Sequence, residues 1–131
     1  LLRYAGLMAL PQPLRLPALV CMPALGRWAM VTVAWLSPYA RTEGGLAAPF
    51  LLHLSVLHVI GATCVLAAAL AVGFGIPGAV MTMVVGGGIV LAVRASCRHW
   101  FGGITGDMLG ATNELVEILF LLLLPGALIL R

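Results

Sequence analysis

The amino-acid sequence predicts an all-α fold: a polytopic transmembrane helix bundle of about four spans plus a partial N-terminal helix. Of its 131 residues, 63% are hydrophobic and only 8% are charged, and the mean hydropathy is +1.16. Apolar stretches of about 20 residues, the length that crosses a bilayer core, recur between breaks rich in Gly and Pro. Such a chain cannot cover itself with polar surface, which excludes a soluble domain.

The first third of the chain is expected to hold the partial helix and the first span. Residues 1–10 are interpreted as the end of a further helix, with the letters "PQP" as the turn that follows. A span over residues 14–36 must accommodate two prolines and Arg27. The apolar run "WAMVTVAWL" after Arg27 offsets the insertion cost of that charge, roughly 2.5 to 3.5 kcal/mol at a membrane centre.

Three further spans are expected over residues 50–71, 76–93 and 108–130. The break "GFGIP" separates the first two of these. Pro125 interrupts the last one and is expected to kink or end it.

Two polar connections, residues 37–49 and 94–107, should face the same side of the membrane, because two spans separate them. Arg27 can approach this side if its helix is short or broken. The positive-inside rule makes this side cytoplasmic. The charged and titratable residues that the connections carry are Arg41, Glu43, Arg94, Arg98, His99 and Asp107.

The last span begins with an acidic stripe. At 100° per residue, Glu114 lies almost directly above Asp107, and Glu117 is about 80° away. Ionisable groups at membrane depth usually face a bundle interior or a wet cavity. Carboxylates on one helix face suit Mg²⁺, which prefers oxygen ligands and binds together with substrate phosphates. The stripe therefore predicts a metal–phosphate site.

The segment before this stripe is suited to phosphate. The letters "GGITG" supply a backbone that an anion can approach closely, next to a helix N-terminus. Arg94 and Arg98, spaced i and i+4, would share a helix face beside it. Structural alternatives remain open: Asp107 as a helix cap, Glu114 as a hydrogen-bonding group between helices, and the two arginines as topology anchors.

Three blocks of the sequence resemble one enzyme family. "GGITGDMLGATNELVEILFLL" is similar to the C-terminal signature of cobalamin synthase, adenosylcobinamide-GDP ribazoletransferase, while "ALGRWAMV" and "PYAR" followed by "GGL" are similar to its middle motifs. The resemblance implies a multi-pass enzyme of the cell inner membrane. It would transfer the adenosylcobinamide-phosphate moiety of adenosylcobinamide-GDP to α-ribazole or its 5'-phosphate, release GMP and require Mg²⁺.

The resemblance also implies roles for residues of this chain. Asp107 and Glu114 are expected to be catalytic residues or metal ligands, with Glu117 a weaker metal ligand. A glycine-rich loop is expected to meet the phosphates, and four arginines to hold phosphate or ribose groups. The loop residues are Gly102, Gly103, Thr105 and Gly106, and the arginines are Arg27, Arg41, Arg94 and Arg98.

The chain departs from the family in one respect. Family members carry an aspartate-rich motif in their N-terminal half, whereas Asp107 is the only Asp here. Residues 1–131 are therefore expected to be the C-terminal membrane portion, inactive alone, with a homo-oligomer possible. Nucleic acid is not an expected partner, since the arginines do not form basic tracts. The alternative function is a transporter or channel segment with an acidic intramembrane ion site.

Overall fold

The computed structural model describes residues 1–38 and 53–129, with side chains as far as residue 125. These residues form helices and no β-strand, which confirms the all-α prediction. The helices are α1 (Leu2–Ala9), α2 (Gln12–Leu36), α4 (Val56–Phe101) and α5 (Gly106–Ile129). Three of them, α2, α4 and α5, are long and apolar enough to cross a membrane.

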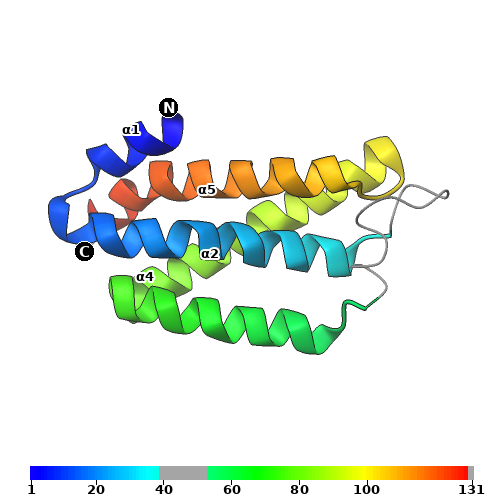
Figure 1. Ribbon diagram of the computed structural model, residues 1–131, viewed down its shortest axis with the longest axis horizontal. Coiled ribbons are helices and arrows are strands. Elements are labelled where there is room, and N and C mark those ends of the chain that lie inside the picture. Colours follow the sequence, from blue (N-terminus) through cyan, green and yellow to red (C-terminus); the bar gives the residue numbers. More distant parts are fainter. Residues whose placement is uncertain (39–52, 130–131) are drawn as a thin grey trace.

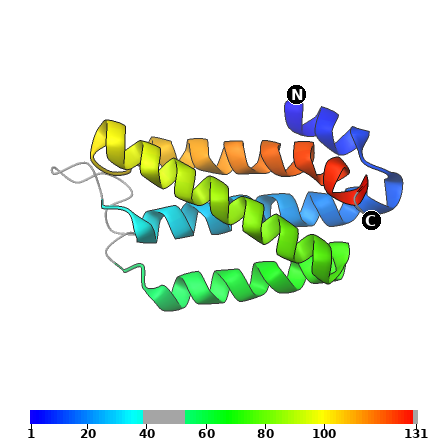
Figure 2. The ribbon, with the colours of Figure 1, turned by 180° about the vertical axis from the view of Figure 1, so that it is seen from behind.

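Helix α4 reverses direction at Gly75. This residue has φ 73° and ψ 171°, a backbone conformation that favours glycine. The first arm, residues 56–74, and the second arm, residues 76–101, run in opposite directions (Figures 1 and 2). At 1.5 Å per residue the arms are about 28 and 39 Å long, which suits a bilayer core of about 30 Å. The bundle thus has four helical segments in the places of the four predicted spans, with α1 as the short additional helix.

The helix boundaries differ from the predicted ones in several places. The first arm begins at Val56 rather than at residue 50, because Ser55 and His58 form a capping box there. The second arm continues past residue 93, so both Arg94 and Arg98 are helical. Pro125 lies inside α5 and does not end it.

The expected turn "PQP" is also shorter than predicted. Gln12 and Pro13 already belong to α2, since proline is tolerated in a first helical turn. Two internal prolines, Pro17 and Pro23, leave α2 continuous from Gln12 to Leu36.

Helix α2 packs against both arms of α4 and against α5. The indole Nε1 of Trp28 donates a hydrogen bond to Thr63 Oγ1 on the first arm, at 2.8 Å. Gly86 on the second arm lies against the same ring, where a Cβ would be 3.3 Å from Trp28 Cζ3. The rings of Phe74 and Phe120 join α4 to α5 edge-to-face at 5.9 Å. These contacts fix the helices that carry the candidate site residues.

The end of α2, the start of the first arm of α4 and the turn between α4 and α5 lie at one end of the bundle, the right-hand end in Figure 1. The backbone N–H of Ile104, between α4 and α5, donates a hydrogen bond to the Pro38 carbonyl after α2, at 2.9 Å. The described ends of the two connections therefore share a side, as predicted; residues 39–49 of the first connection lie outside the described residues. Trp35 and Trp100 are 44% and 76% exposed near this end, as is typical of residues at a membrane–water interface.

Candidate functional site

A cluster of paired charges lies between α1 and α5. Arg3 forms an ion pair with Glu114, and its Nη1 is 3.0 Å from Glu117 Oε2. Asn113 Nδ2 donates a hydrogen bond to the other Glu117 oxygen, Oε1, at 2.8 Å. We refer to Arg3, Asn113, Glu114 and Glu117 as the Arg3 cluster. It confirms that the two glutamates lie together on α5, but it places an arginine from α1 between them.

Helix α2 approaches the Arg3 cluster through a glycine. A Cβ on Gly26 would lie 2.5 Å from Asn113 Oδ1 and 2.9 Å from Glu117 Oε1, closer than real Cβ atoms come. The absence of a side chain at Gly26 therefore allows α2 and α5 to meet at this level. No other residue in the described part of the chain forms a hydrogen bond with Asn113 Oδ1, which is buried.

The two glutamates of the Arg3 cluster have different surroundings. The Glu117 side chain is only 4% exposed, and both of its oxygens are bonded. The Glu114 side chain is 61% exposed and lines an open pocket of about 460 Å³ together with Arg3 and Ile118. Glu117 is therefore fixed inside the protein, whereas Glu114 can still reach a ligand.

Arg27 does not reach the end of the bundle. It follows Gly26 on the unbroken helix α2 and is exposed. Leu36, the last residue of α2, is the ninth residue after Arg27, which places Arg27 roughly 14 Å from the helix end. Arg27 was expected to approach the polar connections only if its helix were short or broken, and α2 is neither. Arg27 lies at the level of the Arg3 cluster, because the preceding residue, Gly26, contacts Asn113 and Glu117.

The connection between α4 and α5 is a compact turn. Gly102 has φ 71° and donates its N–H to the Arg98 carbonyl at 3.2 Å, which ends α4. Within the turn, Gly103 and Ile104 are buried. Thr105 Oγ1 accepts a long hydrogen bond of 3.5 Å from the Met108 N–H and so caps the start of α5. Asp107 is exposed in the first turn of that helix.

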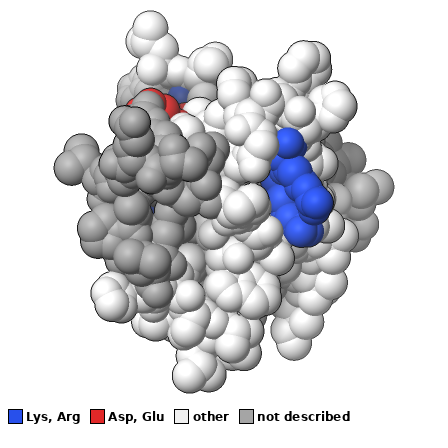
Figure 3. Space-filling view, turned by 90° about the vertical axis from the view of Figure 1, so that its right-hand side faces the viewer, with Lys and Arg blue, Asp and Glu red and all other residues white. Residues whose placement is uncertain are grey.

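Charged side chains are visible at this end of the bundle. Figure 3 views this end and shows a basic patch at its right-hand side and a small acidic spot at its upper left. Arg94 and Arg98, one turn apart near the end of α4, form no ion pair with another described residue. We refer to Arg94, Arg98, residues 102–106 and Asp107 as the connection end. Arg98 is exposed and Arg94 is half-buried, so the Arg98 guanidinium is available to an anionic ligand and Arg94 lies one turn away.

The three predicted metal ligands do not share one site in the structure. Among the described residues, no group of three or more His, Cys, Asp or Glu side chains could hold a metal ion. Glu114 and Glu117 bind Arg3 instead. Asp107 precedes Glu114 by seven residues, about 10 Å along the helix axis. The described residues therefore fit only a cation that takes one carboxylate here and its other ligands from water or a substrate.

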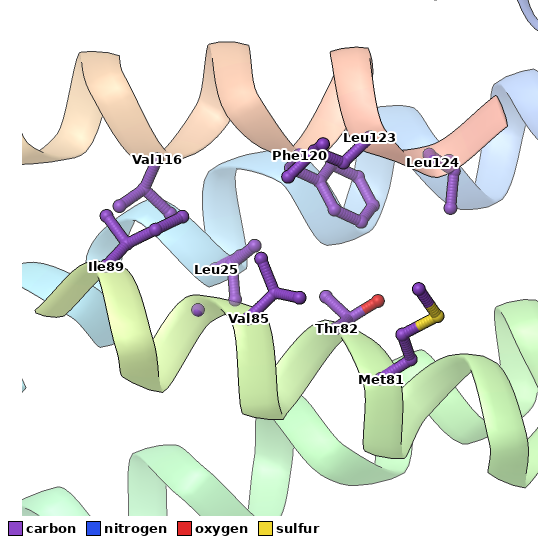
Figure 4. Close-up of a pocket in the computed structure, with 10 residues that line it drawn as sticks. Leu25, Met81, Thr82, Val85, Ile89, Val116, Phe120, Leu123 and Leu124 are labelled. Carbon is purple, nitrogen blue, oxygen red and sulfur yellow. The ribbon is translucent and has the colours of Figure 1, made fainter. Parts of the chain in front are cut away.

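An apolar pocket lies between α2, the second arm of α4 and α5 (Figure 4). Its lining includes Leu25, Ile89 and Phe120, and Thr82 supplies the one side-chain oxygen in it. Its volume is about 40 Å³, enough for a few water molecules at most. The pocket is too small for a nucleotide and has no charged group, so we do not assign it to the site.

The structure thus divides the predicted site residues into two groups. Glu114, Glu117 and Arg27 lie at membrane depth, whereas Asp107, Arg94 and Arg98 lie at the connection end with the glycine-rich turn. Arg41 lies outside the described residues. Sequence reasoning missed Arg3 and Gly26. A lone Arg in an apolar segment, in a chain with two membrane-depth glutamates, was a usable signal, because intramembrane charges pair with one another.

Comparisons with known proteins agree on one family. The family model described as Cobalamin-5-phosphate synthase matches residues 1–125. The adenosylcobinamide-GDP ribazoletransferase of Syntrophobacter fumaroxidans is 46% identical over 106 residues, which cover 79% of this chain and 41% of the relative. The enzyme of the same name from Desulforamulus reducens is 37% identical over 126 residues, covering 95% and 50%. The chain therefore spans half or less of these relatives' length. No solved structure matches the chain.

Proposed function

This chain belongs to the cobalamin-5-phosphate synthase family, and we propose on that premise that it works in the last steps of cobalamin assembly. The proposed reaction transfers the adenosylcobinamide-phosphate moiety of adenosylcobinamide-GDP to α-ribazole or its 5'-phosphate. The acceptor hydroxyl attacks the phosphorus that carries the cobinamide, the bond from that phosphorus to the bridging oxygen breaks, and GMP leaves.

One observation carries the assignment to this chain. The Ile104–Pro38 hydrogen bond joins the turn between α4 and α5 to the end of α2, and the glycine-rich turn, Asp107, Arg94 and Arg98 all lie at this end of the bundle. A diphosphate needs positive charge on its oxygens, because negative charge develops on the departing GMP. Arg94 and Arg98 would bind these oxygens, and the backbone N–H groups at the start of α5 would assist.

The proposed cofactor is Mg²⁺. This ion keeps several waters and binds through one or two carboxylates plus substrate phosphates. Asp107 would supply such a carboxylate, with Glu114 as a second candidate reached through its exposed side. When bound, the ion would neutralise charge on the diphosphate. Further carboxylates from outside the described residues are part of this proposal, because the described residues alone offer too few.

The proposed location is the cell inner membrane, with the connection end on the cytoplasmic side. Three helices of sufficient length and apolarity support a multi-pass protein. The positive-inside rule supports the orientation, since Arg94 and Arg98 lie at this end. The proposed partners are adenosylcobinamide-GDP, α-ribazole and the lipid bilayer. A homo-oligomer is also part of the proposal.

The test is GMP release from adenosylcobinamide-GDP by membranes that contain the full-length protein. We expect release that depends on α-ribazole or its phosphate, stops when EDTA removes divalent cations and returns with Mg²⁺. Asp107→Asn should abolish most of it, while Ser96→Ala, an exposed residue of the same end, serves as the matched control. Release that persists in Asp107→Asn would contradict the role of Asp107.

No observation favours the transporter alternative. At membrane depth the glutamates bind Arg3, so the described residues do not form an open chain of carboxylates for ion relay. Ion flux and GMP release can be measured on the same protein reconstituted into proteoliposomes. Ion flux without GMP release would favour the transporter function over the transferase function.

A further inference from the structure

The Arg3 cluster joins three helices at one point. Arg3 comes from α1, Gly26 from α2, and Asn113, Glu114 and Glu117 from α5. The two terminal nitrogens of Arg3 bind different carboxylates: Nη1 binds Glu117, and Nη2 binds Glu114. A guanidinium is planar and holds its partners at fixed angles. The position of the Glu114 carboxylate therefore depends on where Arg3 lies.

Glu117 in turn fixes the position of Arg3. Its carboxylate is almost fully buried, with one oxygen on Arg3 and the other on Asn113. Removing the guanidinium would leave a buried charge unpaired, which apolar surroundings strongly disfavour. Glu117 is therefore an anchor for Arg3, and Glu114 is the member of the cluster that remains exposed, at 61%.

Helix α2 also contacts Glu117, at the carboxylate oxygen that Arg3 does not bind. The backbone of Gly26 lies against Asn113 Oδ1 and Glu117 Oε1, so that an added Cβ would displace both groups. The described structure contains other helical glycines without this constraint. A Cβ on Gly87, for example, would meet no atom within 4 Å.

We propose that Arg3 and Gly26 are positioning residues for Glu114: Arg3 through its ion pair and Gly26 through Glu117 and Asn113 hold the Glu114 carboxylate where it acts on the reacting diphosphate or its cation. This inference rests on the proposed function and adds α1 to the parts of the chain that the reaction needs. Neither residue touches substrate. Their effect reaches the reaction only through Glu114.

The experiment measures kcat and KM for GMP release with the full-length protein and its variants. Arg3→Gln and Gly26→Ala should each lower kcat by roughly 10- to 100-fold, the scale expected for a misplaced reacting group, with KM for adenosylcobinamide-GDP changed little. Arg3→Lys should recover part of the loss, because it restores the positive charge. Gly87→Ala is the matched control and should behave as the unaltered protein.

A double-substitution cycle separates positioning from general stability. If Arg3 acts through Glu114, adding Arg3→Gln to Glu114→Gln should cause little further loss of kcat, since both changes disable the same carboxylate. If the kcat losses of the two single variants multiply in the double variant, the inference is overturned. Full activity of Arg3→Gln would also overturn it, and so would a loss of activity no larger than the loss of monodisperse protein.

Two provisions keep the test decisive. If Arg3→Gln does not fold, the kcat values of Arg3→Lys and Gly26→Ala are compared with that of the unaltered protein instead. If the unaltered protein releases no GMP, the proposed function itself fails and this inference fails with it. An active unaltered protein with an unaffected Arg3→Gln variant overturns the inference alone.

Discussion

The two charged regions of the bundle differ in how their charges are neutralised. In the Arg3 cluster both carboxylates are paired with one guanidinium, and Glu117 is almost fully buried. At the connection end Arg94 and Arg98 are without an ion pair in the described structure and lie near the water interface. Apolar surroundings retain a charge only when it is paired. We infer that the Arg3 cluster mainly serves structure and positioning, and that the connection end mainly serves ligand binding.

The largest effect on stability is expected from Glu117→Ala. It leaves the Arg3 guanidinium and the Asn113 amide without their buried partner, which should lower the free energy of unfolding by about 3 kcal/mol. Thermal unfolding in detergent micelles measures this loss. Glu114→Ala is the matched control and should cost less, because the Glu114 side chain is mostly exposed. Equal losses would contradict the distinction between the two glutamates.

Asp107→Asn should show the reverse behaviour. We expect a loss of kcat of roughly 100-fold or more, the scale of removing one electrostatic stabiliser from an active site. The free energy of unfolding should change by less than about 1 kcal/mol, since an exposed Asp in a first helical turn contributes no more than that. Steady-state kinetics and thermal unfolding of the same preparation check both parts. A variant that loses stability in proportion to activity would place Asp107 among the structural residues.

Replacing Arg94 or Arg98 at the connection end should raise KM more than it lowers kcat. Arg94→Gln and Arg98→Gln should each raise KM for adenosylcobinamide-GDP by about 10-fold, in keeping with about 1.5 to 3 kcal/mol for a hydrogen bond to a charged group. Part of the difference from the unaltered protein should disappear at high ionic strength, because salt screens exposed charges. If KM is unchanged in both variants, the arginines are topology anchors and do not bind phosphate.

The smallest effect is expected from Arg15→Gln, which tests the attachment of α1 without touching the Arg3 cluster. Arg15 donates hydrogen bonds to the carbonyls of Leu10 and Met8 at the end of α1, both at 3.0 Å. Their loss should lower the unfolding free energy by about 1 kcal/mol or less, as both groups can bind water instead. Activity should be retained. A loss as large as that of Arg3→Gln would mean that docking of α1 matters, and the Arg3 charge does not.

The crossings could be predicted from the sequence because they follow from hydropathy and length alone. The reversal at Gly75 was visible in "GFGIP", and the spacing of Arg94 and Arg98 set their common helix face. The start of the first arm could not be placed, since an apolar run does not mark the residue at which helical hydrogen bonding begins. Ser55 and His58 set that point through their own hydrogen bonds.

The pairing of Arg3 with two glutamates more than 100 residues away could not be derived from spacing. It depends on how α1 folds back along α5, where Gly6 lies against Leu121, and no periodicity encodes that approach. The same holds for Gly26: its identity suggests a close contact, but only the packed helices name Asn113 and Glu117 as the neighbours. The residue types therefore indicated that paired charges were present, and tertiary packing determined which residues pair.

The backbone reversal at Gly75 decides which helix ends share one end of the bundle. A straight helix of the length of α4, 46 residues, would measure about 69 Å, more than twice the thickness of the hydrocarbon core. Because the chain instead turns back, α5 starts at the end of the bundle where α2 ends, as the Ile104–Pro38 hydrogen bond shows. A single glycine conformation thus keeps these helix ends together, and under the proposed function the groups expected to bind phosphate there would all face one compartment.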